Sequence, residues 1–529
     1  MGTDMNKILI LDFGSQYTQL IARRARELGF YSFIIPGSAP FARIRDFEPQ
    51  AIVLSGGPSS VYEEGSPKLA PEFWPWIEQT KLPLLGICYG MQLMVQHFGG
   101  KISPADHREY GKMNVEVLSA SSFFEGVSHF QAWMSHGDET LALPAGFTLA
   151  AKSAEGAVAA ITHDRLPIYG IQFHPEVTHT ESGTKLIENF FIRSAGLKPD
   201  WQMSRVIDEQ IRRIQNEVPT DAHVICALSG GVDSTVAATL VHRAIGGRLH
   251  CVFVDTGLLR YQEGDRVMEL FTQQLRLPVM RVNAEEQFLS KLAGVSDPEQ
   301  KRKIIGAEFI AVFDDAALAL EKQLGARPKY LVQGTLYPDV IESAPPPSSA
   351  GEAKHSHTIK SHHNVGGLPK DLKFSLIEPF RDLFKDEVRE IGRQLGVPEA
   401  FIQRHPFPGP GLAVRLLGEI TKEKLDILRH ADEIFIQALR DDGLYDQIWQ
   451  AMAVLLPVKT VGVQGDGRTH AQVVALRAVT SQDGMTADFY PFDLNFLGKV
   501  SRKICNEVRG VNRVVYDVTS KPPATIEWE

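Results

Sequence analysis

Alternation between short apolar runs and amphipathic segments is the feature of this sequence that most limits its fold. From residue 7 to about 195, buried-strand patterns such as KILILD, AIVLS and LPLLGIC alternate with segments of helical spacing such as YTQLIARRARELG. The alternation returns in HVICALSGG, LHCVFVDTG and YLVQGTLYPD, after a linker and an amphipathic helix near residues 203–218. Strands that alternate with helices form mostly parallel sheets. We therefore expect two successive open, mostly parallel α/β domains.

The last part of the chain has a different pattern. From about residue 405, a long helix is followed by two strand-like segments, a second helix and a final strand, which is typical of a small α+β domain. A chain of 529 residues is too long for one hydrophobic core. We predict three domains, at residues 6–197, 198–404 and 405–529. Residues 343–368 are rich in Pro, Ser, Gly and His without apolar periodicity, which predicts a mobile lid or a disordered loop.

Composition argues against several classes of protein. The net charge of −9 disfavours general attraction to nucleic acid, and no apolar run is long enough to span a bilayer. Four cysteines without a CxxC spacing form neither a disulfide framework nor a zinc site. The N-terminal residues lack the pattern of a secretory signal. We expect a soluble, cytoplasmic protein that has neither a nucleic-acid nor a membrane partner.

The motif GICYG at residues 86–90 places Cys88 at a turn between a strand and a helix. Small flanking residues allow the sharp turn that lifts a nucleophile clear of a sheet, and a helix N-terminus favours the thiolate. For an arbitrary cysteine a buried structural role is the usual alternative. The context of Cys88 favours a nucleophile.

A catalytic thiolate needs a proton shuttle, and His174 is the first candidate. It ends an apolar strand, and Glu176 would lie on the same side of an extended chain and steer the imidazole. A lone histidine is more often structural, and His136 in MSHGD is the second candidate. We predict that the backbone N–H groups of Gly57, in the loop SGGPSS, and of Tyr89 form an oxyanion hole, with a plain surface turn as the alternative for the loop.

Together, the motifs DFGSQ, SGGP, GICYGMQ and FHPEV resemble those of class I glutamine amidotransferases. The resemblance implies that Cys88 attacks the carboxamide of glutamine to form a glutamyl thioester. It also implies that His174 protonates the departing ammonia and that Glu176 holds the imidazole.

A second motif, ALSGGVDST at residues 227–235, joins a strand to a helix-compatible segment. Such a turn offers backbone N–H groups to a phosphate, although no GK[ST] follows as in a Walker A loop. The loop resembles that of ATP pyrophosphatases, which cleave ATP to AMP and pyrophosphate. The resemblance places the nucleoside near Val254 and Asp255, and it places the phosphates on Ser229, Gly230, Gly231, Val232, Asp233, Ser234 and Thr235.

A metal ion is expected only as a companion of ATP. Mg²⁺ would screen the charge of the leaving pyrophosphate, and Asp339 is its candidate partner. Lys360 is our candidate for a cation that moves onto the phosphates. Four histidines of the same segment permit a metal site by spacing alone, but His-rich loops are often only solvated; these are His355, His357, His362 and His363.

Neither motif identifies the acceptor of the ammonia, so the remaining sequence must do so. The stretches QKRKIIGAEF, QGTLYPDVIESA, KSHHNVGGLP, RHPFPGPGLAVR, KTVGVQGDGR and SKPPATIEWE resemble the GMP synthetase family over essentially the whole chain. The resemblance implies amination of xanthosine 5′-monophosphate (XMP) to GMP through an adenylyl-XMP intermediate. It implies glutamine, ATP and XMP as substrates, Mg²⁺ with ATP, no prosthetic group, and a homodimer formed through the last domain.

The same resemblance suggests the contacts to XMP, which are Arg302, Asp466, Lys521 and Glu527. Arg477 is a further anion partner, with a solvated surface position as an equal alternative. Two other functions compete with this interpretation. One is amination of a different oxo-heterocycle or of a carboxylate, and the other is a nucleotide-binding protein without activity. The second predicts the loss of at least one chemical residue, whereas Cys88, His174, Glu176 and the SGGVDS loop are all present.

Overall fold

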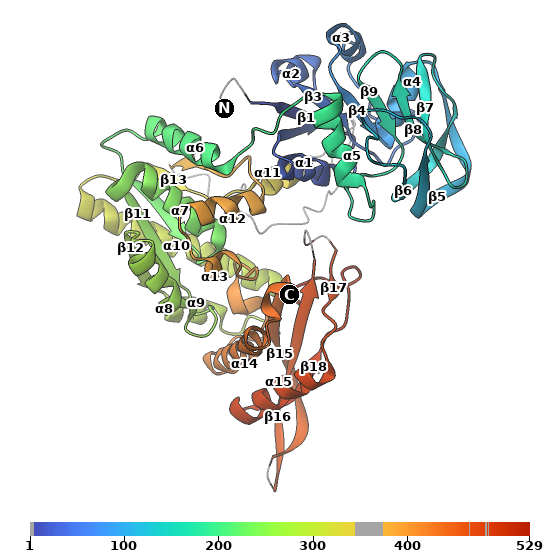
Figure 1. Ribbon diagram of the computed structural model, residues 1–529. Coiled ribbons are helices and arrows are strands. Elements are labelled where there is room, and N and C mark those ends of the chain that lie inside the picture. The colour runs from blue at the N-terminus through green and yellow to red at the C-terminus, as the bar shows by residue number, and fades with distance from the viewer. Residues whose placement is uncertain (1–4, 344–373, 465, 482–483, 485) are drawn as a thin grey trace. The chain divides into compact units, whose positions relative to one another are not determined.

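The computed structural model describes residues 5–343, 374–464, 466–481, 484 and 486–529. These residues divide into two compact units, 5–206 and 207–529 (Figure 1). The predicted lid lies outside the described residues beyond Ser343. None of the helices within the described ranges is long and apolar enough to cross a membrane.

The first unit contains one nine-stranded sheet, whose strand order is β2-β1-β3-β4-β9-β8-β7-β5-β6. Five strands pair in parallel: β2 (Tyr31–Pro36), β1 (Lys7–Asp12), β3 (Ala51–Leu54), β4 (Leu84–Ile87) and β9 (Ile168–Ile171). The other four continue the sheet in antiparallel fashion: β8 (Val158–His163), β7 (Phe147–Ser153), β5 (Lys101–Val117) and β6 (His129–Ala142). The parallel half confirms the predicted α/β class.

The antiparallel half was not predicted, and the burial pattern of β6 explains why. Every second residue from Phe130 to Thr140 is buried, as expected for a strand with one face on the core. The later inward positions, however, carry the polar residues His136, Asp138 and Thr140. The alternation between apolar and polar residues therefore does not continue along this strand.

Short helices accompany the parallel strands of the first unit: α1 (Thr18–Glu27), α2 (Phe41–Asp46), α3 (Phe73–Thr80), α4 (Tyr89–His97) and α5 (Gly183–Asn189). The strands are almost wholly buried because helices or loops cover both faces of the sheet, so they are apolar on both sides. Helix α1 is amphipathic and buries Ile21, Ala22 and Ala25.

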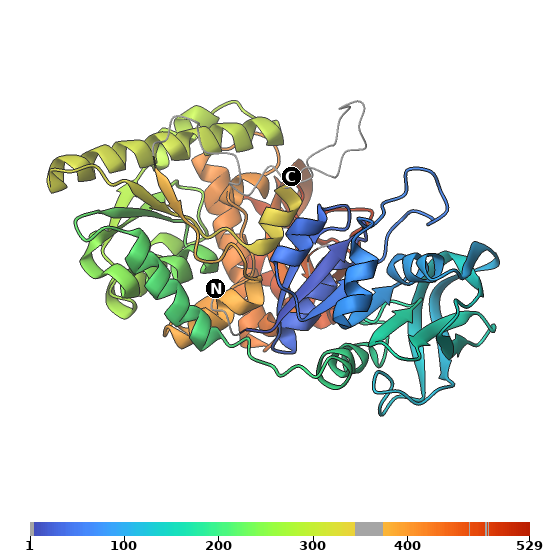
Figure 2. The same ribbon diagram turned by 90° about the horizontal axis from the view of Figure 1, so that it is seen from above.

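The second unit begins within α6 (Met203–Glu217), the amphipathic helix expected after the linker. The first of its two sheets is parallel throughout, in the order β12-β11-β10-β13-β14, with bounds Val279–Asn283, Leu249–Asp255, Val224–Leu228, Tyr330–Val332 and Ser375–Ile377. The connecting helices are α7 (Val232–Ile245), α8 (Glu263–Glu269), α9 (Glu285–Leu292), α10 (Pro298–Leu324), α11 (Tyr337–Ser343), α12 (Lys385–Gln394) and α13 (Glu399–Ile402). Figure 2 shows the long α10 running beside this sheet.

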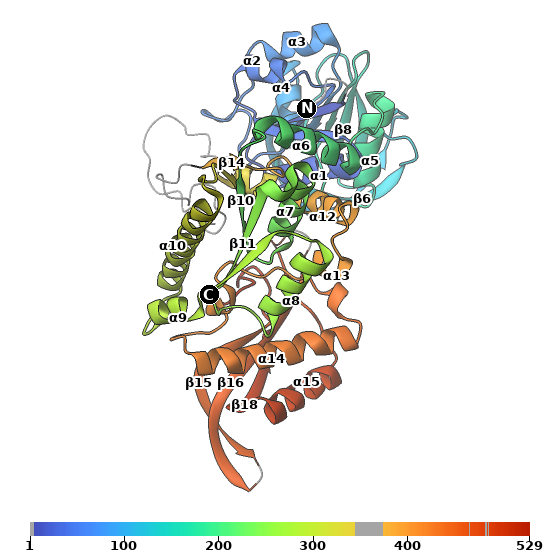
Figure 3. The ribbon, with the colours of Figure 1, turned by 90° about the vertical axis from the view of Figure 1, so that its left-hand side faces the viewer.

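The α+β part of the second unit contains a four-stranded sheet of β15 (Gln450–Gln464), β16 (Gly467–Thr480), β17 (Asp488–Phe489) and β18 (Val511–Tyr516). β16 pairs antiparallel with β15 and β17 and parallel with β18. Helices α14 (Lys422–Asp441) and α15 (Leu494–Glu507) lie side by side against this sheet (Figure 3). Apart from the two-residue strand β17, the order of these elements is the one predicted.

One apolar core joins the two parts of the second unit. It runs from Ile225 and Val252 in the parallel sheet through Phe313 of α10 to Phe435 of α14 and Leu476 of β16. Shared burial of this kind couples the parts mechanically, since separating them would expose apolar surface to water. The predicted boundary near residue 404 therefore falls inside one compact unit.

Candidate active sites

A strained turn between β4 and α4 carries Cys88. Its backbone angles, φ 51° and ψ −107°, are ones that residues with side chains rarely adopt. A Cβ atom added to Gly86 would lie 2.8 Å from the carbonyl oxygen of Gly90, and one added to Gly90 would lie 2.5 Å from that of Leu54. Both glycines are therefore required by packing, and the geometry is that of the predicted nucleophile turn.

His174 and Glu176 form a buried pair at the end of β9. Nδ1 of His174 lies 2.8 Å from Oε1 of Glu176, and the two side chains are 4% and 0% exposed. Burial by itself lowers the pKa of His174. The negative charge of Glu176 and the interaction with Cys88 outweigh it and hold the pKa well above 6.5. The electrostatics of the pair therefore favour the protonated imidazole beside the nucleophile.

The sulfur atom has two further neighbours that sequence analysis did not single out. Nε2 of Gln172 lies 3.5 Å from Sγ of Cys88 and donates to it, and the carbonyl oxygen of Ser135 lies 3.9 Å from the same Sγ. Gln172 is itself oriented by Gln92, whose Nε2 lies 3.4 Å from the Gln172 Oε1. A donor aimed at sulfur stabilises the thiolate. The available signal was the position of Gln172 two residues before His174.

The loop after β3 borders the Cys–His pair through Gly56. A Cβ atom added there would lie 3.0 Å from Cε1 of His174 and 3.6 Å from Cβ of Cys88. A Cβ atom on Gly57 would instead meet the carbonyl oxygen of Phe13 at 2.7 Å. Tyr89 opens α4, so its N–H has no acceptor within the helix. The oxyanion roles of Gly57 and Tyr89 stay predictions.

His136, the second candidate for the shuttle, has both ring nitrogens engaged elsewhere. Nε2 lies 3.1 Å from Oε2 of Glu109, and Nδ1 lies 3.0 Å from the carbonyl oxygen of Asp138. Glu109 also accepts a hydrogen bond from the hydroxyl of Ser153 at 2.6 Å. Burial raises the pKa of Glu109, but hydrogen bonds from His136 and Ser153 lower it further than burial raises it. His136 thus belongs to a buried network that joins β5, β6 and β7.

In the second unit, the SGGVDST segment forms a turn from β10 into α7, as predicted. Gly230 has φ 77°, a value that favours glycine, and Gly231 precedes the first residue of α7. The hydroxyls of Ser229 and Ser234 lie 3.1 Å apart, and the Ser229 hydroxyl accepts from the N–H of Gly231 at 3.2 Å. The hydroxyl of Thr235 donates to the Gly231 carbonyl at 2.8 Å. Exposed N–H and O–H groups at a helix N-terminus suit a phosphate.

Lys385 is a cation at this loop that sequence analysis missed. Its Nζ lies 3.5 Å from Oδ2 of Asp233. Oδ1 of Asp233 is buried and has no hydrogen-bond partner within the part of the chain that the structure describes. The predicted cation, Lys360, lies outside the described residues. Asp233 therefore has an oxygen available for a ligand or for a metal ion that accompanies one.

The predicted nucleoside contacts lie on β11, and the predicted partner of Mg²⁺ lies on α11. Val254 and Asp255 end β11, and Oδ2 of Asp255 accepts from Nη2 of Arg281 at 2.6 Å. Oδ2 of Asp339 accepts from the N–H of Leu336 at 3.1 Å, at the start of α11. Among the described residues, no group of three or more His, Cys, Asp or Glu side chains could hold a metal ion by itself.

The predicted XMP residues come from separate segments of the second unit. Arg302 lies on α10, where Nη1 is 3.7 Å from Oε2 of Glu299. Asp466 lies at the exposed tip between β15 and β16. Nζ of Lys521 donates to the carbonyl oxygen of Gly484 at 2.7 Å. Glu527 accepts two hydrogen bonds from Arg415, which are described below. These roles stay predictions.

Arg477 is neither a solvated surface residue nor a free anion partner. Its side chain is fully buried, and Nη1 lies 2.7 Å from Oδ2 of Asp517. Nη1, Nη2 and Nε also donate to the backbone carbonyls of Thr519, Thr525 and Ile526, respectively, at 2.8–3.0 Å. The solvated surface position was therefore wrong, because the sequence gives no sign that residues 517–526 fold back over β16.

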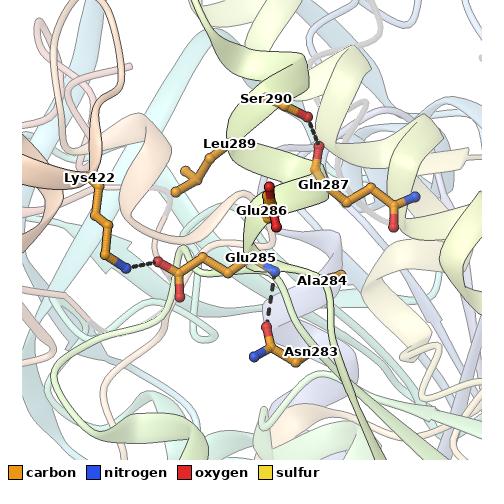
Figure 4. A pocket seen from close by; sticks show the side chains of 8 residues that line it. All are labelled: Asn283, Ala284, Glu285, Glu286, Gln287, Leu289, Ser290 and Lys422. Carbon is orange, nitrogen blue, oxygen red and sulfur yellow. Dashed lines mark hydrogen bonds and ion pairs between the residues drawn. The ribbon is translucent and has the colours of Figure 1, made fainter.

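An open hollow lies at the start of α9, where β12 ends (Figure 4). Glu285 and Glu286 line it, and Glu285 is paired with Lys422. The N–H of Glu285 donates to Oδ1 of Asn283 at 3.2 Å. Two carboxylates disfavour a phosphate at this position, and the SGGVDST turn does not line the hollow. The hollow is therefore not our candidate for a nucleotide phosphate site.

Comparison with known proteins agrees with this geometry. Residues 9–194 match the family described as glutamine amidotransferase class-I, and residues 437–528 match the GMP synthase C terminal domain. The first unit, with its cysteine turn and His–Glu pair, is thus a class I glutamine amidotransferase domain. The relatives that match over the whole chain define the family more closely.

Two of these relatives are described as glutamine-hydrolysing GMP synthases. The protein of Nitrobacter hamburgensis is 56% identical over 528 residues, which is 99% of this chain and 96% of the relative. The protein of Brachyspira hyodysenteriae is 54% identical over 531 residues and covers 100% of both chains. The chain belongs to the glutamine-hydrolysing GMP synthase family, and it is a ligase that uses glutamine as amido donor.

Proposed function

We propose that this chain aminates XMP to GMP with nitrogen from glutamine, through an adenylyl-XMP intermediate, while ATP is cleaved to AMP and pyrophosphate. The observation that carries the proposal is the presence, in one chain, of a buried Cys–His–Glu arrangement and a separate glycine-rich turn at the N-terminus of a helix. Relatives named GMP synthase over the full length support the choice of acceptor.

In the first half-reaction, the thiolate of Cys88 attacks the carboxamide carbon of glutamine. A C–S bond forms, and the C–N bond breaks as protonated His174 gives its proton to the departing ammonia. Glu176 keeps the imidazole charged and oriented through the 2.8 Å contact at Nδ1. Water then hydrolyses the thioester to glutamate, with His174 accepting the proton. Gln172 stabilises the sulfur each time it carries negative charge.

In the second half-reaction, the 2-oxo oxygen of XMP attacks the α-phosphorus of ATP and pyrophosphate leaves. Ammonia then forms a bond to C2 and the C–O bond to AMP breaks. Residues 229–235 would bind the leaving pyrophosphate through N–H and O–H donors, with Lys385 beside them. Mg²⁺ bound with ATP supplies charge screening, and Asp233 and Asp339 would hold it.

The acceptor would contact Arg302, Asp466, Lys521 and Glu527, which are carried over from the family resemblance. The family resemblance also implies a homodimer through residues 405–529. Exposed apolar side chains support this, because pairing would remove them from water. They include Val461 and Val463 on the β15–β16 hairpin and Leu494 at the start of α15.

An assay of acceptor dependence tests the proposed function directly. Purified protein with Mg-ATP and ammonium should form AMP, pyrophosphate and GMP in equal amounts when XMP is present. Xanthosine, inosine 5′-monophosphate and aspartate in place of XMP should give no AMP above background. Product chromatography and coupled pyrophosphate detection measure both outcomes. Absence of AMP formation with XMP and ammonium would contradict the proposal, and AMP formation with another acceptor would replace it.

The replacement of Glu176 by glutamine should shift the pH dependence of glutamine hydrolysis. In the unaltered protein the raised pKa of His174 keeps the ring protonated above pH 6.5, and the proton is lost as the pH rises through that pKa. Without the carboxylate, burial dominates and the pKa falls. We expect kcat/KM for glutamine to drop about 100-fold at neutral pH, with the alkaline limb moved to lower pH.

The pH profile of ammonium-driven synthesis serves as the control, since that reaction bypasses His174. It should be the same in the Glu176→Gln variant and in the unaltered protein. An alkaline limb for glutamine hydrolysis that does not move would show that Glu176 does not set the charge of the imidazole.

A further inference from the structure

Three fully buried cations hold residues 519–529, called here the tail segment. Lys301, Arg415 and Arg477 each have a side-chain exposure of 0% and each is paired with a carboxylate. The tail segment contains Lys521 and Glu527, two of the four candidate XMP contacts. A segment without a helix or extended strand of its own is therefore fixed by charged groups that come from elsewhere in the second unit.

Lys301 uses every donor of its ammonium group in this arrangement. Its Nζ lies 2.6 Å from Oε2 of Glu529, 2.8 Å from the carbonyl oxygen of Leu416 and 3.2 Å from that of Ala413. An ammonium group has three N–H donors, so these bonds use all of them. Lys301 lies on α10 directly before Arg302, a third candidate XMP contact. The side chain thus joins α10, the 413–416 turn and the tail segment.

The two carbonyls that Lys301 binds flank Arg415 in the chain. Arg415 makes a two-pronged contact with Glu527, with Nε 3.1 Å from Oε2 and Nη2 2.8 Å from Oε1. Gln450 contacts the same Oε1 at 2.5 Å. Lys301 therefore fixes the turn that carries Arg415, and Arg415 orients Glu527.

Burial makes this arrangement all-or-none. A lysine ammonium removed from water without partners either loses its proton or destabilises the fold. Lys301 is satisfied only when the tail segment is docked, because Glu529 supplies its one negative charge. We therefore expect two states of the tail segment. It is either fully docked, with Glu527 in place, or undocked, and in the undocked state the acceptor site lacks Glu527.

We propose that Lys301 is a positioning residue for the acceptor nucleotide. It acts through Glu529 and the 413–416 turn to place Glu527 and Arg302 for XMP, and it does not itself touch the reacting atoms. The inference rests on the proposed function, because it takes XMP as the acceptor that Glu527 and Arg302 recognise.

The test compares Lys301→Met, Glu529→Gln and the double variant in ammonium-driven synthesis. Met keeps the length of the side chain and removes the charge, and Gln keeps an acceptor for Lys301 and removes the charge of Glu529. We expect KM for XMP to rise about tenfold or more in each single variant, while kcat changes by less than about threefold. The double variant should be no worse than Lys301→Met, since the two residues act as one pair.

Lys303→Met is the matched control, because Lys303 is an exposed lysine on the same helix. Its KM for XMP should equal that of the unaltered protein. If the unaltered protein does not turn over XMP, the proposed function fails. If it does, and both single variants keep KM within twofold, the role of Lys301 is refuted. An effect in Lys301→Met with a normal Glu529→Gln also refutes it, and a thermal unfolding scan would then assign the effect to lost stability.

Discussion

Replacement of Cys88 by alanine should abolish GMP formation from glutamine and leave formation from ammonium close to the unaltered rate. The thiolate is the group that forms a bond to glutamine, and the other three cysteines, Cys226, Cys251 and Cys505, belong to the second unit. We expect a loss of at least about 10³-fold in the glutamine-driven rate, as is typical when a covalent nucleophile is removed. Parallel assays with saturating glutamine and with ammonium measure the two rates.

Cys505→Ala is a suitable control, because Cys505 is a partly buried cysteine on α15 in the second unit. It should leave the glutamine-driven rate unchanged. If Cys88→Ala loses the ammonium-driven rate to the same extent, Cys88 has a role outside the first half-reaction. If the glutamine-driven rate survives in Cys88→Ala, the sulfur is not the nucleophile and the assignment of the site is wrong.

Asp233→Ala should stop pyrophosphate release with either nitrogen source. Asp233 lies in the first turn of α7. Its Oδ1 is buried and has no hydrogen-bond partner among the described residues, and its Oδ2 lies 3.5 Å from Nζ of Lys385. Its removal takes away a partner for the cation that accompanies ATP and leaves Lys385 unpaired. We expect a loss of about 10²-fold to 10³-fold in the rate of AMP formation. Quenched-flow detection of pyrophosphate gives the rate.

The contrast with Cys88→Ala is the informative part of this experiment. Cys88→Ala should lose activity with glutamine only, whereas Asp233→Ala should lose activity with both glutamine and ammonium. Asp221→Ala, at an exposed aspartate before β10, should behave as the unaltered protein. Full activity of Asp233→Ala with ammonium would remove the SGGVDST turn from the mechanism. A lowered unfolding temperature would instead point to loss of the fold, and Asp233→Asn would then separate charge from packing.

Patterns among residues that are close together in the chain predicted most of the site formed by Cys88, His174 and Glu176. GICYG encodes its own turn, since side chains at Gly86 and Gly90 would collide with backbone atoms. His174 and Glu176 meet because they are two residues apart after a strand. The glycines of residues 229–235 likewise specify the turn before α7. In each case the residues that must meet are neighbours in the chain.

What only the tertiary structure decided involves residues far apart in the chain. Gln172 donates a hydrogen bond to the sulfur of Cys88, which is 84 positions away in the chain. Glu109 pairs with His136, which is 27 positions away. Lys301 and Glu529 are separated by 228 residues, and neither charge alone indicates a buried pair.

By itself, then, the sequence determined the α/β class, the order of the main elements in residues 405–529, the cysteine turn with its His–Glu pair, and the family. The tertiary structure decided which charges are buried, which donors face the sulfur, and how residues 517–529 are held. The physical reason is that a turn or a strand pattern depends on local sterics and periodicity. The environment of a charged side chain depends on every segment that packs around it.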